Sequence, residues 1–433
     1  MAGQVASILG DFSATARPAP AALEVMRLSL FDWAACALAG RGEPVAGAVR
    51  RLALAEGGAP EATVVGAGRR GPARTAALVG GTTSHALDYD DTHFAHIGHP
   101  SVAVIPAALA VAERGGRDGE EMLAAALIGA EASVRVGLWL GRAHYQAGFH
   151  QTATAGSFGA TLAAARLAGL SQERTAHALG LAATRASGLK SQFGTMGKPF
   201  NAGIAAANGV EAAALAEAGM VSNPAALDGA QGFGPTHAGE GRAQAWEGLG
   251  EAWLMEEVSH KFHACCHGLH AALEATAALR ERAAGEEVAR LSIATHPRWL
   301  SVCNIAAPAT GLEAKFSYRL SAAMVLAGRD TAAIAAFTDA ACRDPALVAL
   351  RDRVRVEADP ALPESAARVT LRLADGRALC AAHDLLAPME HGERAARLRA
   401  KAEALLGPEQ AARLWAAVRP RVDLAALGRL LSG

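Results

Sequence analysis

The chain has 433 residues, of which 51% are hydrophobic and 19% charged, and its formal net charge at pH 7 is -1. This composition is typical of a globular protein with a large buried core, and the length predicts two or three domains. A balanced charge supplies no basic surface for a phosphate backbone, so we expect no nucleic-acid partner.

Helical spacing of apolar residues dominates roughly the first 280 residues, with glycine- or proline-bearing turns between the segments. The predicted helices are residues 21–39, 101–113, 120–140, 154–167, 172–186 and 202–218. Their many alanines and other small residues predict helices that pack at close range and expose little surface.

The spacing of apolar residues changes to a period of two from about Glu287. The predicted strands are residues 289–293, 354–356 and 369–373, and the predicted helices among them are 313–326 and 331–342. Asp375 and Gly376 predict a hairpin turn after the last of these strands.

These elements predict a mainly α protein with an α+β part. We expect a large helical domain over residues 1–270 and a smaller α+β domain over residues 271–390. The tail, residues 391–433, is helical again, and we expect its helices to return to the helical domain.

Membrane insertion and secretion are disfavoured by the sequence. Apolar runs such as residues 101–112 are shorter than the roughly 18 to 20 residues that cross a bilayer. The N-terminal residues lack the cationic start, apolar block and cleavage site of a signal peptide. The six cysteines are scattered apart from the pair Cys265 and Cys266, as expected of reduced thiols. We therefore expect a cytoplasmic protein with no membrane partner.

Residues 64–71, VVGAGRRG, contain the G-x-G-x-x-G spacing of a dinucleotide-binding turn, and Asp88 follows about twenty residues later. Such a turn needs a strand before it and a second strand that leads to the acid. Here a mainly helical region precedes the glycines, Pro72 follows directly, and the stretch before Asp88 has no strand character. We therefore interpret residues 66–71 as a loop into a helix that starts near Pro72, and we expect no nucleotide cofactor.

Acids, imidazoles and ammonium groups gather in four short segments of an otherwise alanine-rich sequence. The segments are HALDYDDTHFAHIGHP (85–100), GFHQTATAGSFGA (148–160), KSQFGTMGKPFNAG (190–203) and HKFHACCHGLH (260–270). A single histidine on a helix is more often a core or surface residue than a catalyst. Four such segments together predict that at least two of them converge on one pocket.

Lys198 and Lys261 indicate a negatively charged ligand. Ammonium groups beside helix N-termini bind carboxylates through charge-assisted hydrogen bonds and the positive end of the helix dipole. A small polycarboxylate is therefore the expected partner. The same cations would stabilise the enediolate that forms when a base removes a proton next to a carboxylate. A neutral histidine is suited to be that base.

A metal site is the alternative interpretation of these segments. The histidines of the last segment have helical spacing beside two cysteines, but the Cys-x-x-Cys and His-Glu-x-x-His spacings of zinc sites are absent from the sequence. Asp88, Asp90 and His99 would suit a harder ion, whereas the lysines count against a cation. We therefore expect no metal cofactor.

The four segments resemble those of the MmgE/PrpD family, which includes 2-methylcitrate dehydratase, cis-aconitate decarboxylase and iminodisuccinate epimerase. The matching elements are HALDYDDTH at 85–93, HPS at 99–101, GFH at 148–150, GTMGKP around Lys198, KFHACC at 261–266 and EAKFS at 313–317. The resemblance covers nearly the whole chain in order. It implies a large all-helical domain with a smaller α+β lid, a homodimer, and catalysis without metal or organic cofactor.

The resemblance also implies which residues act. The family's pocket positions fall on Asp88, Thr92, His99, His150, Lys198 and Lys261. We expect His150 to remove the proton, with His99 and Asp88 as orienting or second acid/base groups. Lys198 and Lys261 are expected to bind carboxylates, and Thr92 to donate from its hydroxyl. His96 stays an alternative to His99, because the loop after Asp88 is one residue longer than in some relatives.

The expected function is a cofactor-independent lyase or isomerase that removes a proton next to a carboxylate of a small di- or tricarboxylate, as a dehydratase or epimerase would. Decarboxylating relatives carry a tyrosine a few residues after the FS of EAKFS, where this chain has Leu320, and Tyr318 lies two positions earlier. A cis-aconitate-type decarboxylase is one alternative. The others are a metal-dependent hydro-lyase and a non-catalytic carboxylate-binding dimer.

Overall fold

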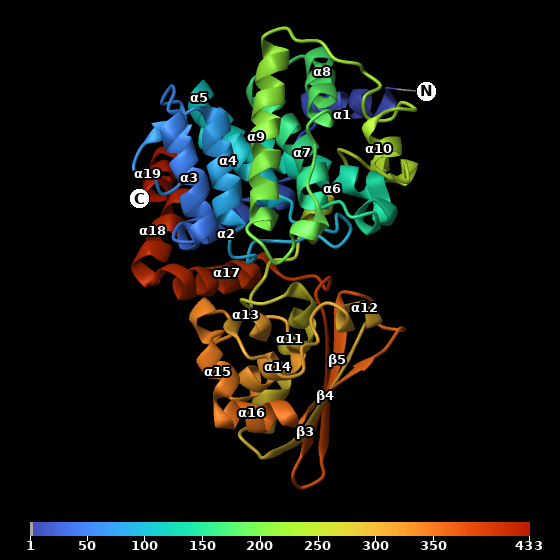
Figure 1. The fold of residues 1–433 in the computed structure, drawn as a ribbon, viewed down its shortest axis with the longest axis vertical. Helices are drawn as coiled ribbons and strands as arrows, with labels where there is room; N and C mark the ends of the chain where they lie inside the picture. Colours follow the sequence, from blue (N-terminus) through green and yellow to red (C-terminus); the bar gives the residue numbers. More distant parts are fainter. Residues whose placement is uncertain (1–2) are drawn as a thin grey trace. The chain divides into compact units, whose positions relative to one another are not determined.

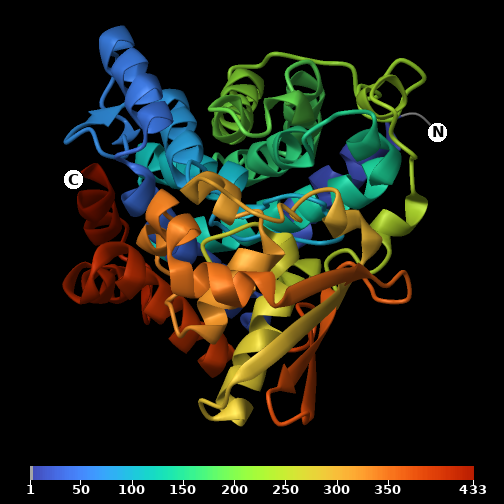
Figure 2. The same ribbon diagram turned by 60° about the horizontal axis from the view of Figure 1, so that its bottom comes forward.

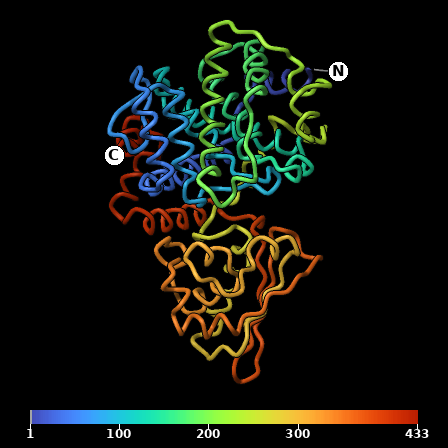
Figure 3. The backbone as a smooth tube through the Cα atoms, viewed as in Figure 1, coloured from blue at the N-terminus to red at the C-terminus, as the bar shows by residue number. Residues whose placement is uncertain are grey.

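The structure is a computed structural model that describes residues 3–433, and the chain forms two compact units. The first unit ends at His260 and also takes in Leu406–Gly433, and the second unit is Lys261–Leu405 (Figures 1 and 3). The first unit is built mainly of helices, with one short two-stranded sheet, and the second combines helices with a four-stranded sheet. The predicted fold class, a large helical domain with a smaller α+β domain, is confirmed.

The first unit contains the long helices that the apolar spacing predicted. They are α1 (Gln4–Thr15), α2 (Pro20–Gly40), α3 (Pro44–Glu56), α4 (Ala73–Ser84), α5 (Ser101–Gly115), α6 (Gly119–Gln146), α7 (Gln151–Leu167), α8 (Gln172–Ala183), α9 (Gly197–Glu217), α18 (Pro408–Val418) and α19 (Leu424–Ser432). Shorter elements are β1 (Ala62–Thr63), β2 (Arg70–Gly71), η1 (Lys190–Gln192), α10 (Phe233–Thr236), η2 (Ala243–Trp246) and η3 (Leu254–Glu257).

Helix α7 forms the centre of the first unit and packs against α5, α6 and α9 (Figure 1). Every residue of α7 except Arg166 is buried, because its alanines, glycines, serine and threonines let neighbouring backbones approach closely. A Cβ on Gly129 of α6, for example, would lie 2.5 Å from the carbonyl oxygen of Gly159 in α7. The small residues of the sequence therefore set the short distances between these helices.

The second unit is built around a mixed sheet with the strand order β4-β3-β5-β6 (Figures 1 and 2). The strands are β3 (Val288–Thr295), β4 (Val354–Ala358), β5 (Ala366–Leu373) and β6 (Ala378–Asp384). The helices are η4 (His267–Leu269), α11 (His270–Ala283), α12 (Pro297–Leu300), α13 (Gly311–Ala314), α14 (Tyr318–Leu326), η5 (Ile334–Ala336), α15 (Asp339–Arg343), α16 (Pro345–Asp352) and α17 (His391–Leu406). Strands β3 and β4 are parallel, and the other pairs are antiparallel.

The predicted hairpin joins β5 to β6. Alternate residues of β5 are buried, and α11 packs against β5 and β6. Gly376 has a φ of 91°, and the Leu373 amide donates to the Arg377 carbonyl across the turn. The period-two spacing and the Asp375–Gly376 pair thus gave the correct position for β5 and for the turn that follows it.

The unit boundary lies at His260 rather than at the predicted residue 270. The chain after His260 is hydrogen-bonded inside the second unit, where the Ala264 amide donates to the Thr331 carbonyl and the Cys266 amide to the Lys315 carbonyl. These pairings join positions far apart in the sequence, so apolar spacing alone could not reveal them.

The predicted return of the C-terminal tail begins later than residue 391. Helix α17 belongs to the second unit apart from its last residue, and Arg397 in it pairs with Glu274 of α11. Helix α18 packs against α2 in the first unit, where the Trp415 and Phe31 rings meet edge to face with centroids 5.0 Å apart. The tail therefore divides at about Leu406.

Two helices predicted in the second unit are each interrupted. The 313–326 segment breaks at Ser317, whose hydroxyl accepts from the Leu320 amide and begins α14. The 331–342 segment contains a short 3-10 turn and then α15, which begins after Thr338. Serine and threonine at these positions satisfy the first amides of a new helix, which favours a break over a continuous helix.

The glycines of residues 66–71 form a tight turn between β1 and β2, and α4 begins at Ala73 after Pro72. Gly66 and Gly68 have φ values of 70° and 65°. Their amides donate to the carbonyls of Leu431 and Ser432 at the end of α19. Because these amides already have carbonyl partners, they are not presented to a phosphate, and the interpretation as a loop is confirmed.

Helix α6 is long and apolar enough to cross a membrane by length and composition. Within the described residues, however, 89% of its most apolar window is buried. This burial is typical of a core helix, and the expectation of no membrane partner stays a prediction.

Candidate functional site

Four helix ends in the first unit carry the polar residues that the sequence singled out. His85 follows the last residue of α4, and His99 lies two residues before α5. His150 directly precedes α7, and Lys198 is the second residue of α9. The first turns of α5, α7 and α9 place the positive ends of three helix dipoles beside these side chains, which favours a negatively charged ligand.

A continuous chain of charged and imidazole groups connects these helix ends. Lys198 Nζ lies 2.6 Å from Asp88 Oδ1, and that oxygen lies 3.4 Å from His99 Nε2. The other ring nitrogen, His99 Nδ1, lies 2.7 Å from Asp90 Oδ2. Asp90 Oδ1 lies 2.8 Å from Nδ1 of His85. One buried carboxylate thus orients two imidazoles.

His150 lies beside His85. Their ring planes are stacked with centroids 6.1 Å apart, and the His150 and Phe193 rings meet edge to face with centroids 5.0 Å apart. The side-chain amide nitrogen of Asn201, on the first turn of α9, lies 3.3 Å from His150 Nδ1. His150 is therefore held by α7, α9 and the segment that joins α8 to α9.

Burial and neighbouring charges set the protonation of these groups. Burial lowers the pKa of His99 to about 4, and Asp90 only partly offsets this by raising it. Burial and the positive charge of Lys198 hold the pKa of His150 well below its usual value. Burial alone would raise the pKa of Asp90, but the charges and hydrogen bonds of His85 and His99 lower it well below its usual value. At neutral pH His99 and His150 are therefore neutral, and Asp90 is ionised.

Asp88 adopts an unusual backbone conformation, with a φ of 51° in the left-handed region. Aspartate tolerates this region better than most residues, but it is still an uncommon conformation. Its side chain is the most exposed of the acid and imidazole groups in the chain of contacts, at 41%. The Asp88 carboxylate lies 2.6 Å from the Lys198 ammonium, and sparsely populated backbone conformations of this kind cluster at functional sites.

Two predicted site residues lie outside this chain of contacts. The backbone of Thr92 pairs with Ser259 in both directions, and its hydroxyl donates to the Ser259 carbonyl at 3.3 Å. Lys261 is the first residue of the second unit and is buried. The expected roles of both residues in binding substrate stay predictions.

His99, and not the alternative His96, belongs to the chain of contacts. His96 Nε2 lies 2.9 Å from the Ser133 hydroxyl of α6. A Cβ on Gly137 of the same helix would lie 2.9 Å from the His96 ring, so this imidazole fills a space between closely packed backbones. Burial lowers the pKa of His96 to about 3, which fits a neutral core residue.

The sequence considered Asp90 only as a possible metal ligand, and it assigned no role to His85 or Asn201. The sequence pattern D-Y-D-D at residues 88–91 could have indicated Asp90, because side chains two residues apart in an irregular loop can point to the same side. His85 was visible as the last polar residue before that loop. Asn201 carried no signal, because its contact with His150 joins residues 51 positions apart.

Two domain descriptions from known protein families match the chain. The MmgE/PrpD N-terminal domain matches residues 4–245, and the MmgE/PrpD C-terminal domain matches residues 263–419. The chain belongs to the MmgE/PrpD family. The resemblance inferred from the polar segments is thereby confirmed.

Several relatives of this MmgE/PrpD chain carry the name cis-aconitate decarboxylase. The Homo sapiens protein is 35% identical over 172 residues, which are 39% of this chain and 36% of that protein. A cis-aconitate decarboxylase-like protein of Aspergillus oryzae is 32% identical over 230 residues, or 49% and 48% of the two chains. The Aspergillus terreus enzyme is 29% identical over 275 residues, or 60% and 56%. The matches thus span between about a third and about half of the relatives' length.

Some residues of this MmgE/PrpD site could also hold a metal ion. His85, Asp88, Asp90 and His99 each bring one donor atom into a group whose atoms lie within 4.8 Å of one another. Two imidazoles and two carboxylates are a ligand set that divalent transition metals accept. The Lys198 ammonium already lies 2.6 Å from Asp88, and a metal bound beside it would meet its positive charge. The position of the lysine counts against a metal, and the expectation of no metal cofactor stays a prediction.

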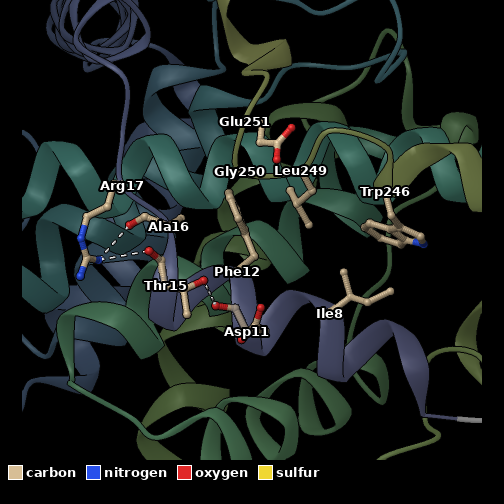
Figure 4. A pocket seen from close by; sticks show the side chains of 10 residues that line it. All are labelled: Ile8, Asp11, Phe12, Thr15, Ala16, Arg17, Trp246, Leu249, Gly250 and Glu251. Carbon is tan, nitrogen blue, oxygen red and sulfur yellow. Dashed lines mark hydrogen bonds between the residues drawn. The ribbon is translucent and has the colours of Figure 1, made fainter.

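A hollow of about 540 Å³ lies elsewhere in the first unit, between α1 and residues 246–251 (Figure 4). Asp11 and Glu251 at its edge are exposed, and Arg17 donates to the carbonyls of Thr15 and Ala16. Its lining includes no imidazole and none of the predicted site residues. The chemistry of the family is therefore expected at the four helix ends rather than in this hollow.

Asp91, next to the site, is expected to make the stability of the protein depend on pH. Burial raises its pKa from 3.8 to about 7, against the lowering effect of a hydrogen bond from Ser101. Between these values the unfolded chain has released the proton that the folded protein keeps. The free energy of unfolding should therefore fall as pH rises from about 4 to 7, by at most about 1.4 kcal/mol per pH unit.

Asp91→Asn should remove this contribution to the pH dependence. Urea unfolding at pH 5, 6, 7 and 8 measures this contribution. The free energy of unfolding of the variant, minus that of the wild-type protein, should rise with pH up to about pH 7. A constant difference across this range would show that Asp91 is ionised in the folded protein.

Proposed function

We propose that this protein is an enzyme that forms or uses a carbanion next to a carboxylate of a small di- or tricarboxylate, as a lyase or isomerase that needs no cofactor. The observation that carries the proposal is the chain of contacts from Lys198 through Asp88, His99 and Asp90 to His85, with His150 beside it. It combines a fixed cation, neutral imidazoles and an ionised carboxylate at three helix N-termini.

Each part of the site has a task in such chemistry. The Lys198 ammonium and the helix dipoles attract a substrate carboxylate. A neutral imidazole accepts the proton from the neighbouring carbon, and the electron pair of the C–H bond moves into the carboxylate as an enediolate. Fixed donors in a dry site stabilise that charge far better than water does. Loss of a hydroxide then gives dehydration, and return of a proton to the opposite face gives epimerisation.

Decarboxylation is a second candidate, favoured by the names of the relatives. Breaking the bond to a carboxylate also leaves an electron pair on carbon, and the same cation and acid groups could stabilise and protonate it. The second unit differs from the pattern of decarboxylating relatives. Leu320 is fully buried, and the Tyr318 hydroxyl lies between the Gly268 carbonyl, at 2.5 Å, and the Thr295 hydroxyl, at 3.1 Å. These contacts favour proton transfer over decarboxylation as the first proposal.

Incubation of the purified protein with citrate, 2-methylcitrate, cis-aconitate and iminodisuccinate in heavy water separates these reactions. A dehydratase forms an alkene, an epimerase deposits deuterium at the α carbon without an alkene, and a decarboxylase releases CO2. Activity that survives a chelator is expected, and its loss would favour the metal-dependent alternative. Binding of these acids without any product would favour a non-catalytic carboxylate-binding protein.

Replacing Lys198 with methionine is expected to lower kcat/KM about 30-fold, mainly through a higher KM. The variant keeps the length of the side chain but loses a charge-assisted hydrogen bond to the substrate. Such a bond contributes about 2 kcal/mol to the binding free energy, which corresponds to about 30-fold. It should also raise the pKa of His150, because the Lys198 charge lowers it in the wild-type protein. Initial rates across a range of pH measure both effects.

Lys190→Met is the matched control for this experiment. Lys190 precedes the same helix, but its ammonium donates to the Tyr145 carbonyl at 3.0 Å and lies over the Tyr145 ring. Its replacement should leave KM unchanged within about twofold. Equal losses in both variants would point to a general effect of positive charge and against a carboxylate site at Lys198.

A further inference from the structure

The residues that neighbour His99 and His150 determine which ring nitrogen of each carries the proton. These proton positions give the two imidazoles different chemical roles. We infer that Asp90 and Asn201 hold these imidazoles in opposite tautomers, so that His99 is the base and His150 is a hydrogen-bond donor. The inference rests on the proposed function and refines it. It reverses the roles expected from the sequence, where His150 was the base.

The tautomer of His99 is set by a carboxylate. Asp90 Oδ2 lies 2.7 Å from His99 Nδ1, and an ionised carboxylate can only accept. The two atoms are not aligned as in a regular hydrogen bond, but the negative charge of Asp90 at this distance in a buried site still favours an N–H over a lone pair on Nδ1. The proton is therefore on Nδ1, and the lone pair is on Nε2. That nitrogen faces Asp88 and the Lys198 ammonium, where a substrate carboxylate is expected.

The tautomer of His150 is set by an amide whose orientation is itself fixed. The side-chain nitrogen of Asn201 lies 3.3 Å from His150 Nδ1 and 3.4 Å from the Leu189 carbonyl oxygen. A backbone carbonyl can only accept, so the atom that faces it must be the amide NH2 and not the amide oxygen. The same NH2 therefore donates to His150 Nδ1. This nitrogen is the acceptor, and the proton of the neutral ring is on Nε2.

The backbone around Gly188 makes this contact possible. Gly188 has a φ of +144°, and its carbonyl accepts from the His150 amide at 2.9 Å. A Cβ at this position would lie 2.6 Å from the Ala153 Cβ and 3.5 Å from the Asn201 Cγ. Only glycine lets the chain pass this close to both α7 and α9. Asn201 is 7% exposed, so water competes little for its amide.

These tautomers define the first chemical step with a balanced transfer of one proton. His99 Nε2 takes the proton from the carbon next to the carboxylate, and the C–H electron pair moves into that carboxylate to form the enediolate. The imidazolium that results has its charge balanced by Asp90. His150 donates its Nε2–H to an enediolate oxygen and keeps this proton, as neutral imidazoles can do when they stabilise an oxyanion. Asp90 and Asn201 act through the two rings and are positioning residues.

The electrostatics of the site agree with this division. Lys198 and the burial of the ring keep the pKa of His150 far below neutral, so the ring stays neutral and offers a single N–H. His99 also remains neutral at pH 7, with its pKa at about 4, but it alone touches a carboxylate that can stabilise its protonated form. Proton uptake is therefore easier at His99 than at His150.

The direct test is nitrogen-15 NMR of the full-length protein labelled at histidine, because protonated and unprotonated ring nitrogens have well-separated shifts. Two buried histidines serve as internal standards. His144 Nδ1 lies 2.6 Å from the His237 carbonyl and must carry the proton there. His93 Nε2 lies 2.8 Å from the Leu254 carbonyl, so in His93 the proton must be on Nε2. His99 should resemble His144, and His150 should resemble His93.

A variant tests the part of Asn201. In Asn201→Asp the neighbour of His150 Nδ1 becomes an acceptor, so the proton should move to Nδ1 and kcat should fall about 100-fold, the effect of removing one oxyanion donor. The new carboxylate should also raise the pKa of His150. The control is Asn208→Asp on the same helix, about two turns further along, where the amide donates to the Arg185 carbonyl. This change should leave kcat within about twofold.

The possible results separate this inference from the proposed function. A wild-type spectrum with the His150 proton on Nδ1, or the His99 proton on Nε2, would overturn the inference whether or not the protein has activity. The expected tautomers without turnover of any acid would sustain the proton positions, but they would count against the proposed function and against His99 as a base. The wild-type spectrum needs no variant, so the test stands even if Asn201→Asp does not fold.

Discussion

Replacing Asp90 with asparagine is expected to lower kcat about 1000-fold and to leave KM within a few-fold of the wild-type value. Asp90 accepts from His85 through one oxygen and contacts His99 through the other. An asparagine offers one acceptor and one donor, so one of the two rings must change its tautomer. The variant also loses the negative charge that stabilises a protonated base. Changes of this kind at a general base lower rates by about 100- to 10 000-fold.

Asp91→Asn is the matched control for this measurement. The two residues are adjacent and buried, and the substitution is the same, but Asp91 accepts from the hydroxyl of Ser101 rather than from an imidazole. Its kcat should stay within about threefold of the wild-type value. Thermal unfolding of both variants establishes that each is folded. A folded Asp90→Asn protein with more than a tenth of the wild-type kcat would show that Asp90 does not position the base.

The sequence was sufficient to find four groups of the candidate site, but not Asn201 and not the contacts among the groups. Lys198, Asp88, His99 and His150 each stood in a polar segment at the end of an alanine-rich helix. The structure brings these four together, as the convergence of polar segments predicted. The roles of the two histidines depend on single atoms of Asp90 and Asn201, and no spacing in the sequence encodes which ring nitrogen an amide or carboxylate will face.

The elements of the fold were predictable to the extent that local spacing determines them. The strong periodicity of α6 and of β5 gave correct types and positions. The break before α15 was missed because it depends on a single cap, where Thr338 accepts from the Ala341 amide. The unit boundary at His260 was missed because backbone pairings distant in sequence define it. The glycines of residues 66–71 were interpreted as a loop because no strand pattern surrounds them. Their amides donate to carbonyls at the end of α19, which agrees with that interpretation.

Gly203→Ala is expected to be among the most destabilising single-methyl changes in the first unit, at about 3 kcal/mol or more. A Cβ there would lie well inside contact distance of the Thr82 hydroxyl oxygen and the Leu78 carbonyl oxygen of α4, and 3.1 Å from the Thr82 amide nitrogen. Two of these atoms belong to backbone, so the helices must separate. Overpacking of a core costs about 1–3 kcal/mol, and more where backbone must move. The melting temperature and urea unfolding measure the loss.

Gly47→Ala on α3 is the control, because only the end of the flexible Arg51 side chain lies near its added methyl group. It should gain up to about 1 kcal/mol, since alanine favours a helix interior over glycine. Separation of α4 from α9 by Gly203→Ala should also move Lys198 relative to His85, because each lies at the end of one of these helices. Activity measured below the melting temperature should therefore fall in this variant and not in Gly47→Ala. Unchanged stability in Gly203→Ala would mean that α4 and α9 pack less closely than the glycine contacts require.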